Sequence, residues 1–128
     1  QYGLVNPIAG LVLLDAFGLD MYEYLSDPSS TSERYYQTFL QVFSTNPQQW
    51  YRASPIRYVK DIRNPQLILV GERTYPTIQR QNRRLFQYLI STAQARAEFH
   101  QIPRRNHFAM VASMFFSGPR ATGFVRHR

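Results

Sequence analysis

The residues best suited to chemistry lie near the C-terminus, in the run Pro103-Arg104-Arg105-Asn106-His107-Phe108-Ala109-Met110. The run separates two apolar segments, so we expect His107 on a loop between a strand and a helix. Histidine titrates near neutral pH, and a histidine held in such a loop can accept and return a proton during a reaction. A single histidine beside Phe and Met is also common as a packed or surface residue. The run therefore marks His107 as a candidate general base and leaves a structural role open.

The remaining residues offer few other reactive groups. The spacing of His100, His107 and His127 is not that of metal ligands, and neither His-x-x-x-His nor Asp-x-Asp occurs. We interpret His100 as a structural residue within a strand and His127 as an exposed residue of a basic tail. Cysteine is absent, which excludes a thiol nucleophile, a disulfide and a Cys-based zinc site. The six glycines are scattered singly rather than gathered in a phosphate-binding loop. We expect neither a metal nor a cofactor.

Three apolar runs predict the strands that would position His107. Residues 8–14 and 66–70 are continuous apolar runs, as expected for parallel strands that are covered on both faces. Residues 97–102 form a weaker run that alternates more. The first run ends at Asp15 and the second at Gly71.

Helical patterns fill the segments between these runs. Ser30-Thr31-Ser32-Glu33 has the spacing of a capping box, and the apolar residues that follow it share one predicted helix face: Tyr35, Tyr36, Phe39, Val42 and Phe43. Asn46 followed by Pro47 predicts the start of another short helix. Pro76 precedes a helix with one apolar and one basic side, whose residues are Ile78, Leu85, Phe86 and Leu89 against Arg80, Arg83 and Arg84. Residues 108–116 predict a buried helix that ends before Gly118-Pro119.

The order of these elements predicts an α/β fold, with a partial parallel sheet of about three strands and flanking helices. The length of 128 residues fits one domain, and 44% apolar content with nine Tyr and nine Phe argues against disorder. Three strands make a thin sheet, so we expect them to need neighbours. Because the chain opens at Gln1 without a Met, we expect it to be processed, truncated or excerpted from a longer protein.

The charge pattern gives little support to a nucleic-acid partner. The net charge is +7, carried by fourteen Arg and one Lys, but these residues are spread from Arg34 to Arg128 without a block of like charges. Such a pattern is typical of a solvated, arginine-rich surface. No apolar run approaches the roughly 20 residues of a membrane-spanning helix, and the first residues of the sequence do not have the charged-then-apolar pattern of a signal peptide. We therefore expect no nucleic-acid partner and no membrane span.

Taken in order, the segments resemble the α/β-hydrolase fold, specifically its esterase and lipase-like branch. Residues 8–20 resemble the sixth strand of that family and the start of its cap, and residues 46–56 resemble the return from the cap. Residues 65–71 resemble the seventh strand. Asn106-His107-Phe108-Ala109-Met110 resembles the histidine loop. The resemblance implies that residues 1–128 are the C-terminal portion of one hydrolase domain. It also implies that residues 20–52 form a cap-like helical insertion.

Enzymes of this family use a serine on a Gly-x-Ser-x-Gly turn, a histidine and a carboxylate. No Gly-x-Ser-x-Gly occurs here, and the family order would place it before residue 8, so we expect the nucleophile to be missing from this chain and the chain alone to be inactive. Thr74 occupies the position where the family commonly carries its aspartate. Glu72 and Asp15 are the possible replacements, since Asp15 ends the earlier strand, where some relatives carry the acid.

The resemblance leads to two function hypotheses. The first is the C-terminal part of a serine esterase or lipase-like hydrolase that acts on a carboxylic ester, with His107 as general base and Glu72 or Asp15 as acid. Its substrate pocket would include Phe17, Tyr22, Tyr24 and Phe108. For the aromatic residues between 22 and 51, packing in a core or between cap and core is the favoured role. The alternative is a non-catalytic binding module with a degraded triad, suggested by Thr74. In either case, the expected partner is the remainder of the domain or another chain.

Overall fold

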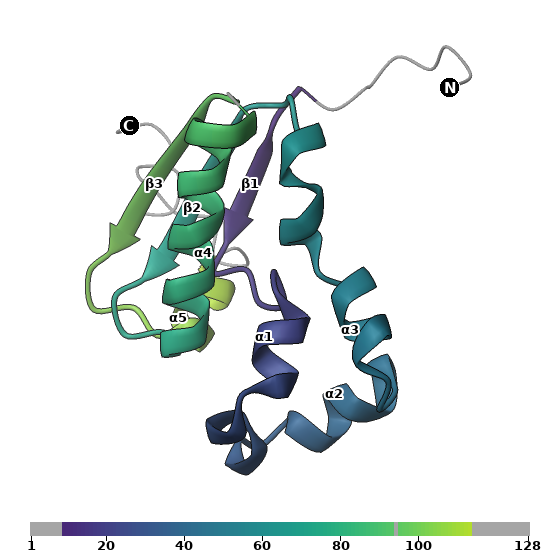
Figure 1. Cartoon of the computed structure of the whole chain (residues 1–128). Coiled ribbons are helices and arrows are strands. Elements are labelled where there is room, and N and C mark those ends of the chain that lie inside the picture. The colour runs from purple at the N-terminus through teal and green to yellow at the C-terminus, as the bar shows by residue number, and fades with distance from the viewer. Residues whose placement is uncertain (1–8, 94, 114–128) are drawn as a thin grey trace.

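The computed structural model describes residues 9–93 and 95–113 and contains a three-stranded parallel sheet (Figure 1). Its strands are β1 (Leu11–Leu14), β2 (Gln66–Gly71) and β3 (Ala97–Ile102), in the order β1-β2-β3. The predicted class, an α/β fold with a partial parallel sheet of three strands and flanking helices, is confirmed. The prediction for the first strand began at residue 8, which lies outside the described residues.

The register aligns the carboxyl ends of the strands. Leu14 lies opposite Leu69, and Gly71 lies opposite Ile102. The residues that leave the strands therefore emerge at the same edge of the sheet, as parallel pairing requires. Asp15, Glu72 and the loop before His107 all start from this edge.

One face of the sheet is covered by three helical elements. These are α4 (Pro76–Tyr88), the π-helical turn η3 (Leu89–Ala93) and the 3-10 helix η2 (Pro55–Asp61). Their buried side chains form one core with the sheet: Leu19, Ile56, Val59, Ile68, Leu85, Leu89, Ala93 and Ala95. The other face is covered in part by α5 (His107–Ala112), whose Met110 packs on Leu69 and Ile102.

A helical lobe lies beyond the carboxyl ends of the strands (Figure 1). It consists of α1 (Met21–Ser26), the 3-10 helix η1 (Pro28–Ser32), α2 (Tyr36–Phe43) and α3 (Pro47–Arg52). The lobe has an aromatic core of its own, formed by Met21, Tyr24, Leu25, Tyr36 and Trp50 with Phe17, Phe39, Leu40 and Phe43 around them. Burial of these rings stabilises short helices that would be marginal in isolation.

The predicted capping box at residues 30–33 is wrong. Asp27, followed by Pro28, caps the 3-10 helix η1 instead, with its carboxylate accepting from the Ser29 N–H. The Glu33 carboxylate accepts a hydrogen bond of 2.9 Å from the Tyr24 hydroxyl, so it is not free to cap a helix. Consequently α2 begins only at Tyr36.

The buried face of α2 agrees with the prediction for Tyr36, Phe39 and Phe43 and differs for the other two residues. Tyr36, Phe39, Leu40 and Phe43 follow the i, i+3, i+4, i+7 pattern of a buried stripe. Tyr35 and Val42, predicted on the same face, are exposed. The predicted helix start at Asn46 and Pro47 is confirmed, because the Asn46 side chain accepts from the Gln48 N–H at 3.1 Å.

Two predictions about the last helices need correction. The basic side of α4 is not a free surface, because Arg80 and Arg84 contact α1. Residues 108–116 were predicted to form a buried helix, but α5 begins at His107, buries Met110 and leaves Phe108 80% exposed. No side chain of residues 9–93 or 95–113 buries the Phe108 ring. Residues 114–116 and His127 lie outside the described residues.

Candidate functional site

Asp15 and His107 form a paired carboxylate and imidazole at the carboxyl edge of the sheet. Asp15 directly follows β1, and His107 is the first residue of α5, 92 positions later. The Nδ1 atom of His107 lies 2.6 Å from Oδ2 of Asp15. The Asp15 side chain is completely buried, whereas the His107 side chain is 36% exposed. A buried carboxylate thus faces one ring nitrogen of a histidine whose side chain is partly exposed to solvent.

Three donors satisfy the buried Asp15 carboxylate. The Gly71 N–H donates to Oδ1 at 2.8 Å, and the Thr74 hydroxyl donates to Oδ2 at 2.5 Å beside the imidazole. A buried carboxylate is stable only when such donors replace water. The Asp15 backbone has a φ of 53°, a left-handed conformation that Asp tolerates better than most residues. Its N–H donates to the Leu69 carbonyl at 2.7 Å, which fixes the residue to the end of β2.

The histidine loop is held against the end of β2 by close backbone contacts. The Arg73 N–H donates to the Arg105 carbonyl at 2.8 Å, and Asn106 caps α5 by accepting from the Ala109 N–H at 2.7 Å. A β-carbon on Gly71 would lie 2.3 Å from the Arg105 carbonyl oxygen. Only glycine permits this approach, which places His107 next to Asp15.

Of the two acids that the sequence left open, the structure places only Asp15 at His107. The Glu72 carboxylate instead accepts from the Arg104 N–H at 2.7 Å, across the loop that precedes the histidine. Arg104 has a φ of 60°, so Glu72 helps hold a left-handed turn in that loop. Thr74 is buried and contacts Asp15 rather than His107.

The four predicted pocket residues are not gathered at His107. Tyr24 is 2% exposed, and the Phe17 ring packs edge-on against it at a centroid distance of 5.1 Å, so both contribute to the lobe core. Burial and the Glu33 carboxylate raise the pKa of the Tyr24 hydroxyl well above its usual range. Tyr22 is exposed on α1, and Phe108 is exposed on α5. Phe17 and Tyr24 thus pack in a core, which is the other role considered for aromatic residues of this region.

Tyr75 is a neighbour of the site that the sequence reasoning missed. Its ring centroid lies 5.9 Å from that of His107, and its side chain is 55% exposed. The available signal was its position, directly before the proline that starts α4 and close to the carboxyl end of β2. His100, in contrast, lies within β3, partly exposed, with Nε2 3.3 Å from the Glu98 carboxylate.

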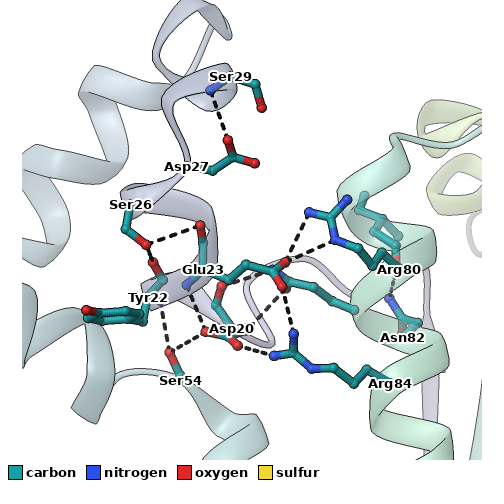
Figure 2. Close-up of polar contacts among 12 residues, drawn as sticks. Asp20, Tyr22, Glu23, Ser26, Asp27, Ser29, Ser54, Arg80, Asn82 and Arg84 are labelled. Carbon is teal, nitrogen blue, oxygen red and sulfur yellow. Dashed lines mark hydrogen bonds and ion pairs between the residues drawn. The ribbon is translucent and has the colours of Figure 1, made fainter.

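A second polar cluster joins the lobe to the sheet domain (Figure 2). We call it the lobe clamp and define it as Asp20 and Glu23 of the lobe with Arg80, Gln81 and Arg84 of α4. Arg84 binds both carboxylates, with its Nη1 2.7 Å from Glu23, and Arg80 binds Glu23 at 3.0 Å. The Gln81 amide accepts from the Asp20 N–H at 2.9 Å and donates to the Asp20 carbonyl at 3.0 Å. The clamp holds α1 in place relative to α4.

Electrostatics of the lobe clamp favour the charged forms of its members. Burial acts to raise the pKa of Glu23, but hydrogen bonds from Gln81 and Arg80 and the charges of Arg80 and Arg84 outweigh it and hold that pKa below its ordinary value. Burial acts to lower the pKa of Arg84, and the two carboxylates reverse this and raise it. The clamp is thus a set of ion pairs rather than a site with an unusual protonation state.

The described residues contain no other arrangement with an evident chemistry. Over residues 9–93 and 95–113, no group of three or more His, Asp or Glu side chains is placed to hold a metal ion. None of the helices in this part of the chain has the length and apolar character needed to cross a membrane. Comparison with protein-family models, with curated proteins and with solved structures found no match.

Proposed function

We propose that the chain carries the acid and base of a serine hydrolase that acts on carboxylic esters, with His107 as the general base and Asp15 as the acid. The observation that carries this proposal is the 2.6 Å contact between Asp15 Oδ2 and His107 Nδ1. A buried carboxylate that accepts a hydrogen bond from Nδ1 favours the tautomer with its proton on Nδ1. The lone pair of that tautomer is on Nε2. In the proposed role, this lone pair on Nε2 of His107 accepts the proton of the nucleophile.

The nucleophile would come from outside the described residues. Among the described residues, no serine hydroxyl bonds to His107; Ser113, the nearest in sequence, donates to the Met110 carbonyl at 2.6 Å. In the proposed reaction, Nε2 accepts the proton of a serine hydroxyl as its oxygen attacks the ester carbonyl. The same proton then passes to the leaving alkoxide, which departs as an alcohol. Water, deprotonated by Nε2 of His107, then attacks the carbonyl of the acyl-serine ester. The bond between the acyl group and the serine oxygen breaks, the carboxylic acid leaves, and the proton on Nε2 returns to the serine oxygen.

The contact between Asp15 and His107 favours a complete acid and base over a degraded triad. That hypothesis rested on Thr74 at the family's usual acid position. Because Asp15 approaches the imidazole from the end of β1, a carboxylate at position 74 is not needed. The lobe, which lies beyond the carboxyl ends of the strands, is where a cap over an ester would lie (Figure 1).

The test uses the protein expressed from its complete coding region and a fluorophosphonate probe, which labels only activated serines. We expect one labelled serine, on a Gly-x-Ser-x-Gly turn, and loss of labelling in Asp15→Asn and His107→Ala. Glu72→Gln is the matched control, because it removes a nearby carboxylate that does not touch His107, and it should keep most of the labelling. A coding region without such a turn, or labelling that survives His107→Ala, refutes the proposal in favour of a binding module.

A further inference from the structure

The hydroxyl of Thr74 is bonded to the same carboxylate oxygen that faces the imidazole. Thr74 Oγ1 lies 2.5 Å from Asp15 Oδ2, and His107 Nδ1 lies 2.6 Å from that atom. The second oxygen, Oδ1, accepts from the Gly71 N–H at 2.8 Å. The three donors come from three separate parts of the chain: the end of β2, the turn that follows it and the start of α5.

This arrangement fixes the rotation of the carboxylate. A carboxylate held at one oxygen can turn about its Cβ–Cγ bond, because that torsion is broad for Asp. Donors on both oxygens, one from the backbone and one from a side chain, determine the plane of the group. The remaining acceptor direction on Oδ2 then points to the imidazole, and no water replaces a lost donor because the Asp15 side chain is completely buried.

Thr74 is itself held in one place. It is 8% exposed, and its N–H bonds to the Gly71 carbonyl at 3.3 Å within the turn. Threonine also has few χ1 rotamers, because its β-carbon is branched. Its hydroxyl is thus a donor with a defined direction rather than a mobile surface group.

We propose that Thr74 is a positioning residue for the base: its hydroxyl orients Asp15 so that the carboxylate holds His107 with the proton on Nδ1. This inference rests on the proposed function and assigns Thr74 a part in it. Thr74 is then not a lost acid. An aspartate at position 74 would place a second carboxylate against a buried one, which like-charge repulsion and burial both disfavour.

The experiment measures the protonated nitrogen directly, by ¹⁵N NMR of the full chain labelled at its three histidines, at a pH where imidazoles are neutral. We expect His107 to carry its proton on Nδ1 in the wild type. In Thr74→Val, which keeps the shape but lacks the donor, a mixture of both tautomers is expected. Thr74→Ser should restore the wild-type signal. His100, on the partly exposed face of β3, serves as the internal reference.

The variants separate the two proposals. If His107 lacks the Nδ1 proton in the wild type, the Asp15–His107 pairing fails, and the proposed function fails with it. If the wild type has that proton and Thr74→Val keeps it unchanged, only the role of Thr74 is refuted. Should Thr74→Val not fold, the pair Thr74→Ala and Thr74→Ser supplies the same comparison. In the full-length enzyme, Thr74→Val should lower kcat by about ten- to a hundredfold with little change in KM.

Discussion

Replacement of Gly71 by alanine tests whether the close approach of the histidine loop to β2 positions the site. The new β-carbon would lie 2.3 Å from the Arg105 carbonyl oxygen and 2.9 Å from Cγ of Met110, where real contacts are at least 3.0 Å. The loop must therefore retreat by at least 0.7 Å, the difference between 3.0 and 2.3 Å. Overpacking of this kind costs about 1–3 kcal/mol, and the lower entropy of the unfolded alanine chain returns about 0.5 kcal/mol.

We expect Gly71→Ala to lower the free energy of unfolding by about 1–2 kcal/mol, which corresponds to a fall in Tm of roughly 3–12 °C for a chain of this length. Urea unfolding at low protein concentration, followed by far-UV circular dichroism, measures the change in the free energy of unfolding. Gly10→Ala is the matched control, because its β-carbon would meet the Pro65 carbonyl oxygen at 3.2 Å, and its effect should stay within about 0.5 kcal/mol.

The histidine signal gives a second measurement of the same change. A loop that retreats moves His107 away from Asp15, so the ¹⁵N spectrum of Gly71→Ala should lose the Nδ1-protonated form of His107 while His100 is unchanged. If Gly71→Ala is no less stable than Gly10→Ala and keeps the wild-type His107 signal, the loop is not held as described, and the reasoning about Gly71 is refuted.

Three further predictions concern the lobe clamp and the edge of the sheet. The folded-state pKa of Glu23 is below its ordinary value of 4.5, so its contribution to stability is present above pH 4.5 and is lost as the pH falls below that value. The wild type should therefore lose more stability between pH 5 and 3 than Glu23→Gln. Urea titrations at each pH measure this difference. Arg84→Gln should cost about 1–2 kcal/mol and speed amide hydrogen exchange in α1 more than in β2; equal exchange in both would contradict a clamp. Among the described residues, one edge of β1 has no paired strand, and Val12 on this strand is 57% exposed. The purified chain should therefore self-associate, as measured by light scattering, and Val12→Lys should reduce the self-association. A monomeric wild type would contradict this prediction.

The elements that depend on local pattern could be predicted from the sequence. A continuous apolar run predicted β2, and a weaker, more alternating run predicted β3. The spacing of Ile78, Leu85 and Leu89 predicted the buried side of α4. Alternation of strands and helices led to parallel pairing, because a crossover connection allows little else. Predictions failed where a local signal competed with a distant partner: the Glu33 carboxylate binds the Tyr24 hydroxyl rather than a helix start, and Arg84 binds the lobe rather than water.

The sequence by itself predicted that His107 follows a strand and precedes a helix, and the family resemblance left Glu72 and Asp15 as candidate acids; the structure places His107 as the first residue of α5 rather than on the loop. Only the tertiary structure decided between these two carboxylates. Asp15 and His107 are separated by 92 positions, and their contact depends on the register of three strands and on the approach of the histidine loop to Gly71. Neither the strand register nor the approach of the loop follows from local sequence pattern, because both are set by the burial of side chains from segments that are distant in the sequence.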